Sequence, residues 1–213
     1  MRAMVLTSSA GFDKSGEPLV MRELPRPVPG VGEILVKVLA CGVCHTELDE
    51  IEGRTPPRKL PVVPGHEIVG RVVENGAECS RHKTGQRVGV GWIHSSNGSA
   101  DENISEAFVA TGRDIDGGYA EYVVVPEGYA YPIPAAFSDA EAAPLLCAGA
   151  VGYRSLRLTN ITDGQVLGLT GFGGSGHLVL QLARYLYPKG KVFVFARSET
   201  ERAFAEELGA NWT

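Results

Sequence analysis

The sequence lacks the features that mark several large classes of protein. No apolar run approaches the roughly 18 residues that cross a membrane, and the apolar stretch at Met1–Leu6 is too short for a secretory signal. Basic residues are not in excess, because 20 lysines and arginines face 25 acidic residues and leave a formal charge of -5. Such a charge disfavours nucleic acid and anionic membranes as partners. We therefore expect a cytoplasmic protein with no nucleic-acid partner and no membrane partner.

Cysteine is also scarce. The chain has four cysteines, Cys41, Cys44, Cys79 and Cys147, and in a reducing compartment these are expected to be metal ligands or free thiols rather than a disulfide framework. The 27 glycines and 13 prolines follow no period, which predicts many turns rather than low complexity. With 213 residues and 44% apolar content, the chain can form one large domain or two small ones.

The most unusual stretch is Pro64–Gly70, where His66 and Glu67 stand side by side in a valine-rich strand pattern. One sulfur from the upstream segment Cys41–Glu47 and one from the distant Cys147 could converge on this histidine. Two thiolates and one imidazole form the three-ligand set, with one open position, that catalytic zinc uses. Taken singly, the histidine could equally be a hydrogen-bonded core residue and Cys147 a small buried apolar side chain.

Two patterns follow each other along the chain. Up to about Ile133, short β-branched runs closed by turn residues predict a sheet or barrel. The runs are Val5–Thr7, Leu19–Leu24, Ile34–Leu39, Ile68–Val73, Arg87–Val90 and Tyr119–Val125. The proline-rich segments 24–30 and 55–58 cannot continue a ladder and are expected to be loops.

Near Ser138 the pattern becomes helical. Ser138 and Glu141 form a capping-box pattern before an alanine- and leucine-rich run, which we expect Gly149 and Gly152 to interrupt before a second piece ending near Leu158. Beyond it, the order strand, helix, strand and helix predicts a parallel βαβα unit. These four elements are predicted at Val166–Thr170, Ser175–Tyr187, Val192–Phe195 and Glu199–Leu208.

A glycine-rich turn joins the first strand and helix of this unit. Gly171, Gly173 and Gly176 make a G-x-G-x-x-G pattern, with Gly174 inside it. In dinucleotide-binding folds such glycines allow a tight turn and a close approach of the backbone, and the helix N-terminus binds a pyrophosphate. The alternative is a glycine-rich turn that only packs the helix tightly on the strand.

Five segments together resemble the N-terminal part of the zinc-dependent medium-chain alcohol dehydrogenases. They are Cys41–Leu48, Pro64–Glu67, Gly89–Trp92, Asp116–Tyr122 and Ala143–Gly149. The resemblance implies a mixed fold of the α+β and α/β classes: a mostly β GroES-like catalytic domain over residues 1–150, then an incomplete Rossmann βαβα unit over residues 151–213. It also implies hydride transfer between a primary or secondary alcohol or aldehyde and NAD(P).

By position in the family's motifs, the resemblance implies that Cys44, His66 and Cys147 are the zinc ligands, with Glu67 beside the metal. Cys41 is then a bystander. The spacing Cys41-x-x-Cys44 alone would also suit a zinc knuckle or a redox pair, but the sequence has no partner C-x-x-C pattern. Zinc in such a set acts as a Lewis acid toward an alcohol oxygen.

The same resemblance assigns roles to the residues after Cys44. It implies that Thr46 hydrogen-bonds the substrate oxygen, that Glu47 orients the ligand histidine, and that His45 contacts the cofactor pyrophosphate. Asp49 stands where many relatives have a histidine as the outer base of a proton relay. A carboxylate is the weaker base, so we expect a lower pH optimum. Trp92 could line the substrate pocket or be an ordinary half-buried aromatic.

Two departures from the family pattern concern metal and cofactor. The places where many relatives have four cysteines for a second, structural zinc here read Asn97, Ala100, Asn103 and Thr111, so we expect one zinc per chain. The end of the second Rossmann strand reads Ala196, Arg197 and Ser198 rather than an acidic residue, which favours NADP over NAD. The alternative is that Arg197 only extends into solvent.

The third departure is length, because relatives continue through further Rossmann strands. The chain is therefore either truncated or part of a longer molecule, and the sequence leaves both open. If it is truncated, we expect poor cofactor binding and open strand edges, through which it could form a homo-oligomer. Two other functions stay open. One is a zinc-free quinone or enoyl reductase of the same superfamily, and the other is a noncatalytic zinc-binding remnant of a dehydrogenase.

Overall fold

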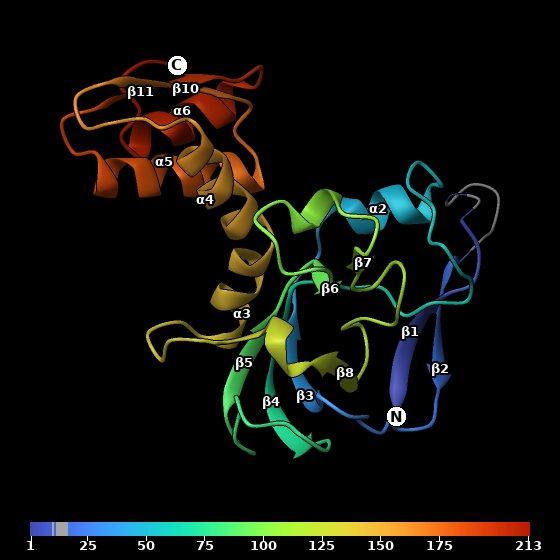
Figure 1. Cartoon of the computed structure of the whole chain (residues 1–213). Coiled ribbons are helices and arrows are strands. Elements are labelled where there is room, and N and C mark those ends of the chain that lie inside the picture. Colours follow the sequence, from blue (N-terminus) through green and yellow to red (C-terminus); the bar gives the residue numbers. More distant parts are fainter. Residues whose placement is uncertain (10, 12–16) are drawn as a thin grey trace. The chain divides into compact units, whose positions relative to one another are not determined.

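The computed structural model describes residues 1–9, 11 and 17–213. By their contacts, the residues separate into a first unit, Met1–Cys147, and a second unit, Ala148–Thr213. Figure 1 labels the elements of both units. Among the described residues, no helix is long and apolar enough to cross a membrane.

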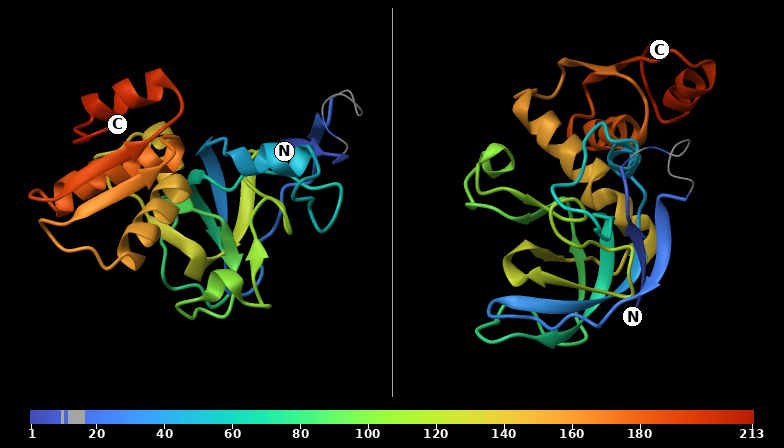
Figure 2. Two further views of the ribbon diagram at one scale, coloured as in Figure 1. Left: turned by 90° about the horizontal axis from the view of Figure 1, so that it is seen from above. Right: turned by 90° about the vertical axis from the view of Figure 1, so that its right-hand side faces the viewer.

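A five-stranded antiparallel sheet with the order β8-β3-β4-β5-β9 is the centre of the first unit. Its strands are β3 (Glu33–Cys41), β4 (Ile68–Asn75), β5 (Arg87–Val90), β8 (Tyr122–Pro126) and β9 (Ala130–Pro132). Figure 2 shows the long strands β3 and β4 running side by side. Alternate residues of these strands, among them Ile34, Val36, Val88 and Val90, form a fully buried core. This is the strand-rich first half that the sequence predicts.

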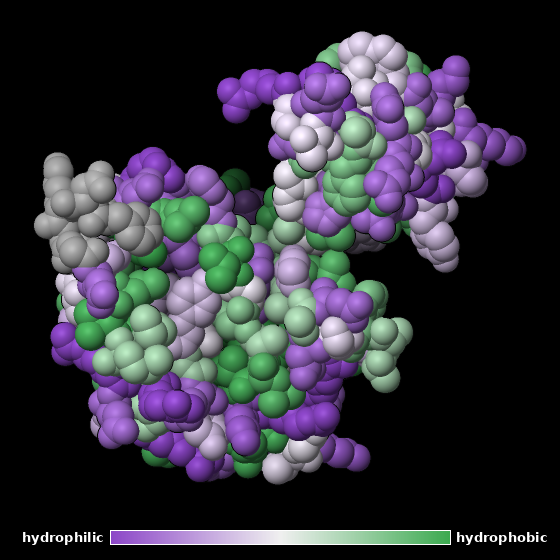
Figure 3. All heavy atoms as spheres, turned by 180° about the vertical axis from the view of Figure 1, so that it is seen from behind, coloured by the Kyte–Doolittle hydropathy of each residue, from purple (hydrophilic) through white to green (hydrophobic). Residues whose placement is uncertain are grey.

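Two short antiparallel pairs complete the sheet structure of the first unit. The strands are β1 (Arg2–Leu6) with β2 (Leu19–Glu23), and β6 (Ile93–Ser95) with β7 (Val109–Ala110). The sequence patterns missed β6, β7 and β9, which have only two or three residues each. On the face of this unit seen in Figure 3, apolar side chains gather between polar ones.

The antiparallel register of β3 and β4 explains why distant residues meet. Cys41, the last residue of β3, pairs with Ile68, the first residue of β4. The segments that continue past both strand ends therefore lie together, and Gly42 N donates to Glu67 O at 2.9 Å. A short helix, α2 (His45–Ile51), follows at once with Cys44 as its N-cap. The sequence patterns did not predict this helix.

The helical run after Ser138 differs from the prediction at one point. The capping box is confirmed, since Glu141 N donates to Ser138 Oγ at 3.3 Å and Ser138 N to Glu141 Oε2 at 2.8 Å. However, the break falls at Cys147 and not at Gly149 or Gly152. The elements are α3 (Asp139–Ala142), a 3-10 helix η3 (Ala143–Leu146) and α4 (Ala148–Leu158).

Local chemistry explains this correction. Pro144 has no N–H to donate to a preceding helical turn, and Cys147 N closes a tight turn onto Pro144 O at 3.3 Å. Gly152 stays helical because it packs against α5, where an added Cβ would lie 2.6 Å from Val179 Cγ2. The glycine thus allows close packing of two helices instead of ending one.

The second unit is the predicted βαβα arrangement. Strands β10 (Val166–Thr170) and β11 (Lys191–Phe195) are parallel, and helices α5 (Gly174–Leu186) and α6 (Glu199–Glu207) follow them in turn. Leu180, Val194 and Ala205 are fully buried in its core. Trp212 bridges to Phe193 on the outer side of β11, whereas β10 has no neighbour on its other side among the described residues.

Candidate metal centre

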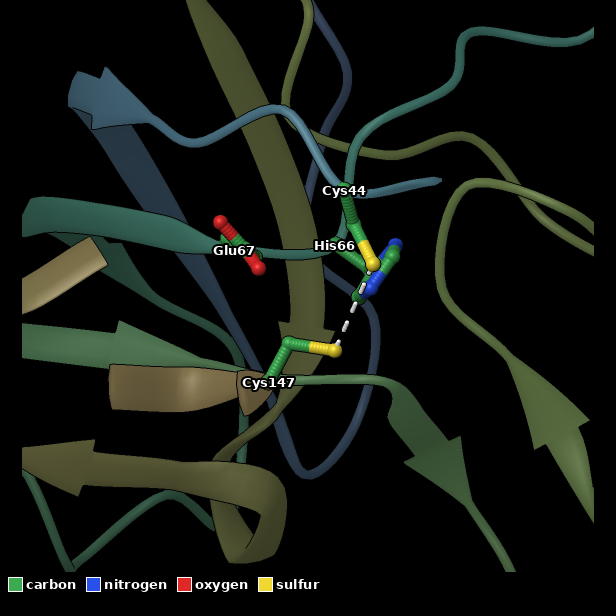
Figure 4. Close-up of side chains that lie close together, drawn as sticks. All are labelled: Cys44, His66, Glu67 and Cys147. Atoms are coloured by element: carbon green, nitrogen blue, oxygen red, sulfur yellow. Dashed lines mark hydrogen bonds between the residues drawn. The ribbon is translucent and has the colours of Figure 1, made fainter. Parts of the chain in front are cut away.

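Four side chains from separate segments of the first unit converge. They are Cys44 at the N-cap of α2, His66 and Glu67 just before β4, and Cys147 after η3. One possible ligand atom from each lies within 4.8 Å of the others. Figure 4 shows the two sulfur atoms and the His66 ring together, with the Glu67 carboxylate to one side.

The spacing of the two sulfur atoms suits a tetrahedral metal. Cys44 Sγ and Cys147 Sγ are 3.8 Å apart. For zinc–sulfur bonds of about 2.3 Å, tetrahedral angles put two thiolates about 3.8 Å apart. The donor set of two thiols and one imidazole therefore fits a zinc ion without rearrangement of the sulfurs.

His66 is held in the orientation that such a site requires. Its Nδ1 lies 2.6 Å from Glu47 Oε1, and both side chains are almost wholly buried. Glu47 Oε2 accepts a hydrogen bond from Cys44 N at 2.8 Å, so one carboxylate connects a ligand ring to the backbone of another ligand. His66 Nε2 is buried with no hydrogen-bond partner among the described residues. This nitrogen is the atom through which His66 would bind a metal.

The cluster is strongly polarised. The hydrogen bond with Cys147, and then the nearby His66 ring, lower the pKa of Cys44 to about 3. The same hydrogen bond to Cys44 raises the pKa of Cys147 above its ordinary value. Burial lowers the pKa of His66, but the nearby Cys44 sulfur and the Glu47 carboxylate outweigh this and raise it to about 9. Burial raises the pKa of Glu67.

Cys41 lies next to the cluster but outside it. Burial raises its pKa to about 12, although Glu67 N donates to its sulfur. Gly65, with φ of 98°, brings the backbone so close that an added Cβ would lie 2.6 Å from the Tyr119 ring and 2.9 Å from Cys41 Sγ. At Gly42, an added Cβ would overlap the Glu67 carboxylate. Backbone and side chains are therefore closely packed around the ligands.

The glycine-rich turn belongs to the second unit. Gly171 has φ of 86°, and its N–H donates to Phe195 O at 2.9 Å. An added Cβ at Gly176 would lie 2.9 Å from Gly171 O. Gly173 is the N-cap of α5. Gly171, Gly173, Gly174 and Gly176 line one hollow, together with Val151, Ser155 and Thr170 among others.

Known proteins similar to this chain are alcohol dehydrogenases. Residues 30–135 match the family described as the alcohol dehydrogenase GroES-like domain. The chain is also 43% identical over 202 residues to "Probable alcohol dehydrogenase AdhA" of Mycobacterium tuberculosis, covering 90% of this chain and 57% of that protein. The chain therefore contains a match to the alcohol dehydrogenase GroES-like domain and is similar to alcohol dehydrogenases over most of its length.

Other relatives extend this result. An alcohol dehydrogenase of Geobacillus stearothermophilus is 40% identical over 210 residues, covering 95% of this chain and 62% of that protein. A cobalt- and zinc-bound alcohol dehydrogenase from Pyrobaculum aerophilum superposes with a TM-score of 0.86 at 26% identity, covering all of this chain and 64% of that one. The CAD from Helicobacter pylori complexed with NADP(H) gives 0.86 at 27%, covering 99% and 63%. The chain spans about three fifths of the length of such relatives.

The residues expected in a proton relay lie on or beside α2. The Cys44 thiol lies 3.6 Å from Thr46 Oγ1. Asp49 Oδ1 accepts from Arg54 Nε at 2.7 Å and lies 3.7 Å from the exposed His45 Nε2. Arg54 follows the helix without any motif, so the sequence patterns gave no reason to place it beside Asp49.

A charged group behind His66 was also missed. The Trp92 ring meets the His66 ring edge-on at 4.8 Å between centroids. Arg113 lies over Trp92 at 5.2 Å and forms two hydrogen bonds with Asp114, at 2.9 and 2.8 Å. Glu50, on the inner face of α2, is 1% exposed. Glu47 and Glu50 are three residues apart and so share one face of α2. This spacing could have indicated that Glu50 is buried, but the helix was not predicted.

The four positions expected to lack a structural zinc lie in and beside the lobe between β6 and β7. Asn97 accepts hydrogen bonds from Ser99, and Thr111 is fully buried at the end of β7. Tyr129 OH holds the lobe by donating to Glu102 Oε2 at 3.0 Å and accepting from Ser96 N at 3.0 Å. Asn97, Ala100, Asn103 and Thr111 do not belong to the candidate ligand cluster found among the described residues.

The residues expected to choose between NADP and NAD follow β11. Arg197 is exposed, and Ser198 Oγ accepts from Glu201 N as the N-cap of α6. Arg202 Nη1 donates to the carbonyls of Ala196 and Arg197 at 2.9 and 2.8 Å, which fixes the turn between strand and helix.

Proposed function

We propose that this chain carries the zinc-binding catalytic part of an alcohol dehydrogenase, which transfers hydride between an alcohol or aldehyde and a nicotinamide cofactor. The observation that carries this proposal is His66 Nε2. It is buried, has no hydrogen-bond partner among the described residues, and belongs to a cluster with two thiols 3.8 Å apart. No role in core packing explains an unpaired nitrogen in that place.

In this proposal Cys44, His66 and Cys147 hold one catalytic zinc ion, which supplies a Lewis acid that favours loss of the alcohol proton. Glu47 keeps the proton of His66 on Nδ1 and so leaves Nε2 as the ligand atom. Thr46 has its hydroxyl next to Cys44 and would hydrogen-bond the substrate oxygen, taking up the substrate proton as it passes its own hydroxyl proton on toward solvent. Asp49 is the outer base, held by Arg54.

The proposed cofactor site is the glycine-rich turn of the second unit. The N–H groups at the start of α5 and the open space beside Gly173 suit a pyrophosphate. Exposed Arg197 favours NADP over NAD, since its guanidinium can bind a 2'-phosphate. Glu199 and Glu201 in the first turn of α6 work against this preference. We propose one zinc per chain, because the lobe lacks thiol ligands.

The test uses the purified chain loaded with zinc. Zinc content is measured first, then binding of NADPH and NADH, and then alcohol oxidation followed by nicotinamide absorbance. We expect about one zinc per chain from the three-ligand site, binding of NADPH ahead of NADH, and turnover that a chelator removes. Absence of zinc would favour the zinc-free reductase. Zinc without binding of either nucleotide would favour the noncatalytic zinc protein.

A further inference from the structure

The strongest anomaly outside the ligand set is Glu50. It lies one turn after Glu47 on the same short helix, and both side chains face the interior. Glu47 uses its two oxygens for His66 and for Cys44 N. Glu50 is 1% exposed, and neither of its oxygens has a hydrogen-bond partner among the described residues. A buried carboxyl group without donors is costly, so its retention needs an explanation.

Among the described residues, each charged group that acts on Glu50 is already engaged or carries the same charge. The charged groups that act on it are Glu47 from its own helix, His66 from the segment before β4, and Arg113 and Asp114 after β7. His66 is engaged by Glu47, and Arg113 is engaged by Asp114 and by the face of Trp92. Burial first, and then the negative charge of Glu47, raise the pKa of Glu50 to about 8. Glu50 is therefore a neutral acid at neutral pH.

We propose that Glu50 is a positioning residue that sets the charge of the metal site through Glu47. As a neutral acid, it adds no charge to that of the Glu47 carboxylate beside His66. When Glu50 ionises, a second negative charge is added behind the Glu47–His66 pair. This proposal rests on the proposed function, because it requires that Cys44, His66 and Cys147 hold the metal.

The added charge has a defined direction of effect. A negative charge behind the imidazole attracts a cation bound on its other side. Zinc affinity therefore rises through the pH range in which Glu50 ionises, beyond the rise that deprotonation of the ligands causes. If Glu50 only fills space, Glu50→Gln should show the same rise of zinc affinity with pH as wild type, because glutamine fills the same space and does not ionise.

The experiment compares three proteins: wild type, Glu50→Gln, and Glu52→Gln as the matched control. Glu52 is the C-cap of the same helix, but its side chain is 37% exposed and pairs with Arg54. Zinc affinity is measured by competition with a coloured chelator from about pH 6 to about pH 9.5, a range that brackets the ionisation of a buried carboxyl group. We expect equal affinities at the acid end. At the alkaline end, wild type and Glu52→Gln should bind zinc about five- to tenfold more tightly than Glu50→Gln.

Two further measurements support the comparison. The first uses wild type and so does not depend on the folding of a variant, and the second records a spectrum of the metal site that a change in packing alone would not make pH-dependent. In wild type without added metal, carbon NMR of labelled glutamate should show a carboxyl group that titrates near pH 8, the value to which the pKa of Glu50 is raised, and this signal should be absent from Glu50→Gln. In the cobalt-loaded protein, the visible d–d bands should shift over the same range in wild type and not in Glu50→Gln.

The outcomes separate this proposal from the proposed function. If wild type binds zinc but all three proteins have the same pH slope, the coupling is wrong while the zinc site stands. If no glutamate titrates above its ordinary range, the neutral acid is wrong even if Glu50→Gln does not fold. If wild type binds no zinc, the proposed function fails first, and the coupling fails with it.

Discussion

The two glycine-rich regions of the molecule differ in what surrounds them. Around the metal cluster, an added Cβ at Gly42 or Gly65 would overlap a neighbouring side chain. In the turn before α5, an added Cβ at Gly171 or Gly173 meets nothing within 4 Å. The first region is closed by its own side chains and is organised before a ligand arrives. The second is open at Gly171 and Gly173, although Gly171 still supplies a backbone with φ of 86°.

Removing a ligand side chain should give the largest effect in the closed region. In His66→Ala the two thiols lose the imidazole between them, and two sulfur ligands do not retain zinc against a competing chelator. We expect the zinc content after dialysis to fall more than about tenfold, because one of three protein ligands is lost. Elemental analysis checks this, and nucleotide binding by the second unit should not change.

Cys79→Ser is the matched control for this prediction. Its thiol donates to Glu33 O at 3.1 Å, away from the cluster, and a hydroxyl can make the same hydrogen bond. The variant should therefore keep its full zinc content. Zinc retained by His66→Ala, or lost from Cys79→Ser, would show that the ligand set is wrong.

Glycine-to-alanine substitutions test whether the glycines near the ligand cluster are closely packed and those before α5 are not. Gly65→Ala forces a side chain onto a backbone with φ of 98° and against the Tyr119 ring, so we expect a loss of about 2–4 kcal/mol in the free energy of unfolding. Gly173 has φ of -90° and open space beside it. Gly173→Ala should therefore change stability by less than about 1 kcal/mol and should weaken nucleotide binding.

Urea unfolding and nucleotide titration measure the two variants side by side. Equal loss of stability in both would mean that the open turn is packed after all. Unchanged nucleotide binding in Gly173→Ala would mean that the turn only packs a helix on a strand, as the sequence alone also allows.

The sequence predicted those elements and site residues that follow a periodic pattern or belong to a motif. β10 spans the predicted residues because an apolar run between turns has few alternatives. α2 was missed because its N-cap is a cysteine, which is not a preferred capping residue. Glu50 and Arg113 escaped notice for a different reason. Their significance depends on what lies around them in space, and no local pattern encodes that burial.

A buried ion pair near the cluster gives a smaller, pH-dependent effect. Asp114 accepts hydrogen bonds from Arg113 and from Ala110 N, the latter at 2.8 Å. Burial raises the pKa of Asp114, but the bonds from Arg113 and Ala110 outweigh it and lower the pKa below 3.8. A lowered pKa adds stability above the ordinary pKa of 3.8, and this stability disappears as the pH falls through the lowered value.

Asp114→Asn should therefore lose about 2–3 kcal/mol in the free energy of unfolding at neutral pH, and the difference from wild type should shrink as the pH falls below 3.8. Urea unfolding across this range checks it. A difference that stays constant with pH would assign the effect to packing and not to charge.

The smallest effects are expected in the second unit after β11, where we assign cofactor binding to one residue and helix capping to the next. The Arg197 side chain is exposed to solvent. Arg197→Ala should leave the free energy of unfolding within about 0.5 kcal/mol of wild type, while NADP affinity falls about tenfold and NAD affinity does not. Ser198 caps α6, so Ser198→Ala should cost about 1 kcal/mol of stability. Nucleotide titration and urea unfolding of both variants separate binding from folding. If Arg197→Ala leaves the ratio of NADP to NAD affinity unchanged, this arginine only extends into solvent, and the acidic first turn of α6 decides the cofactor instead.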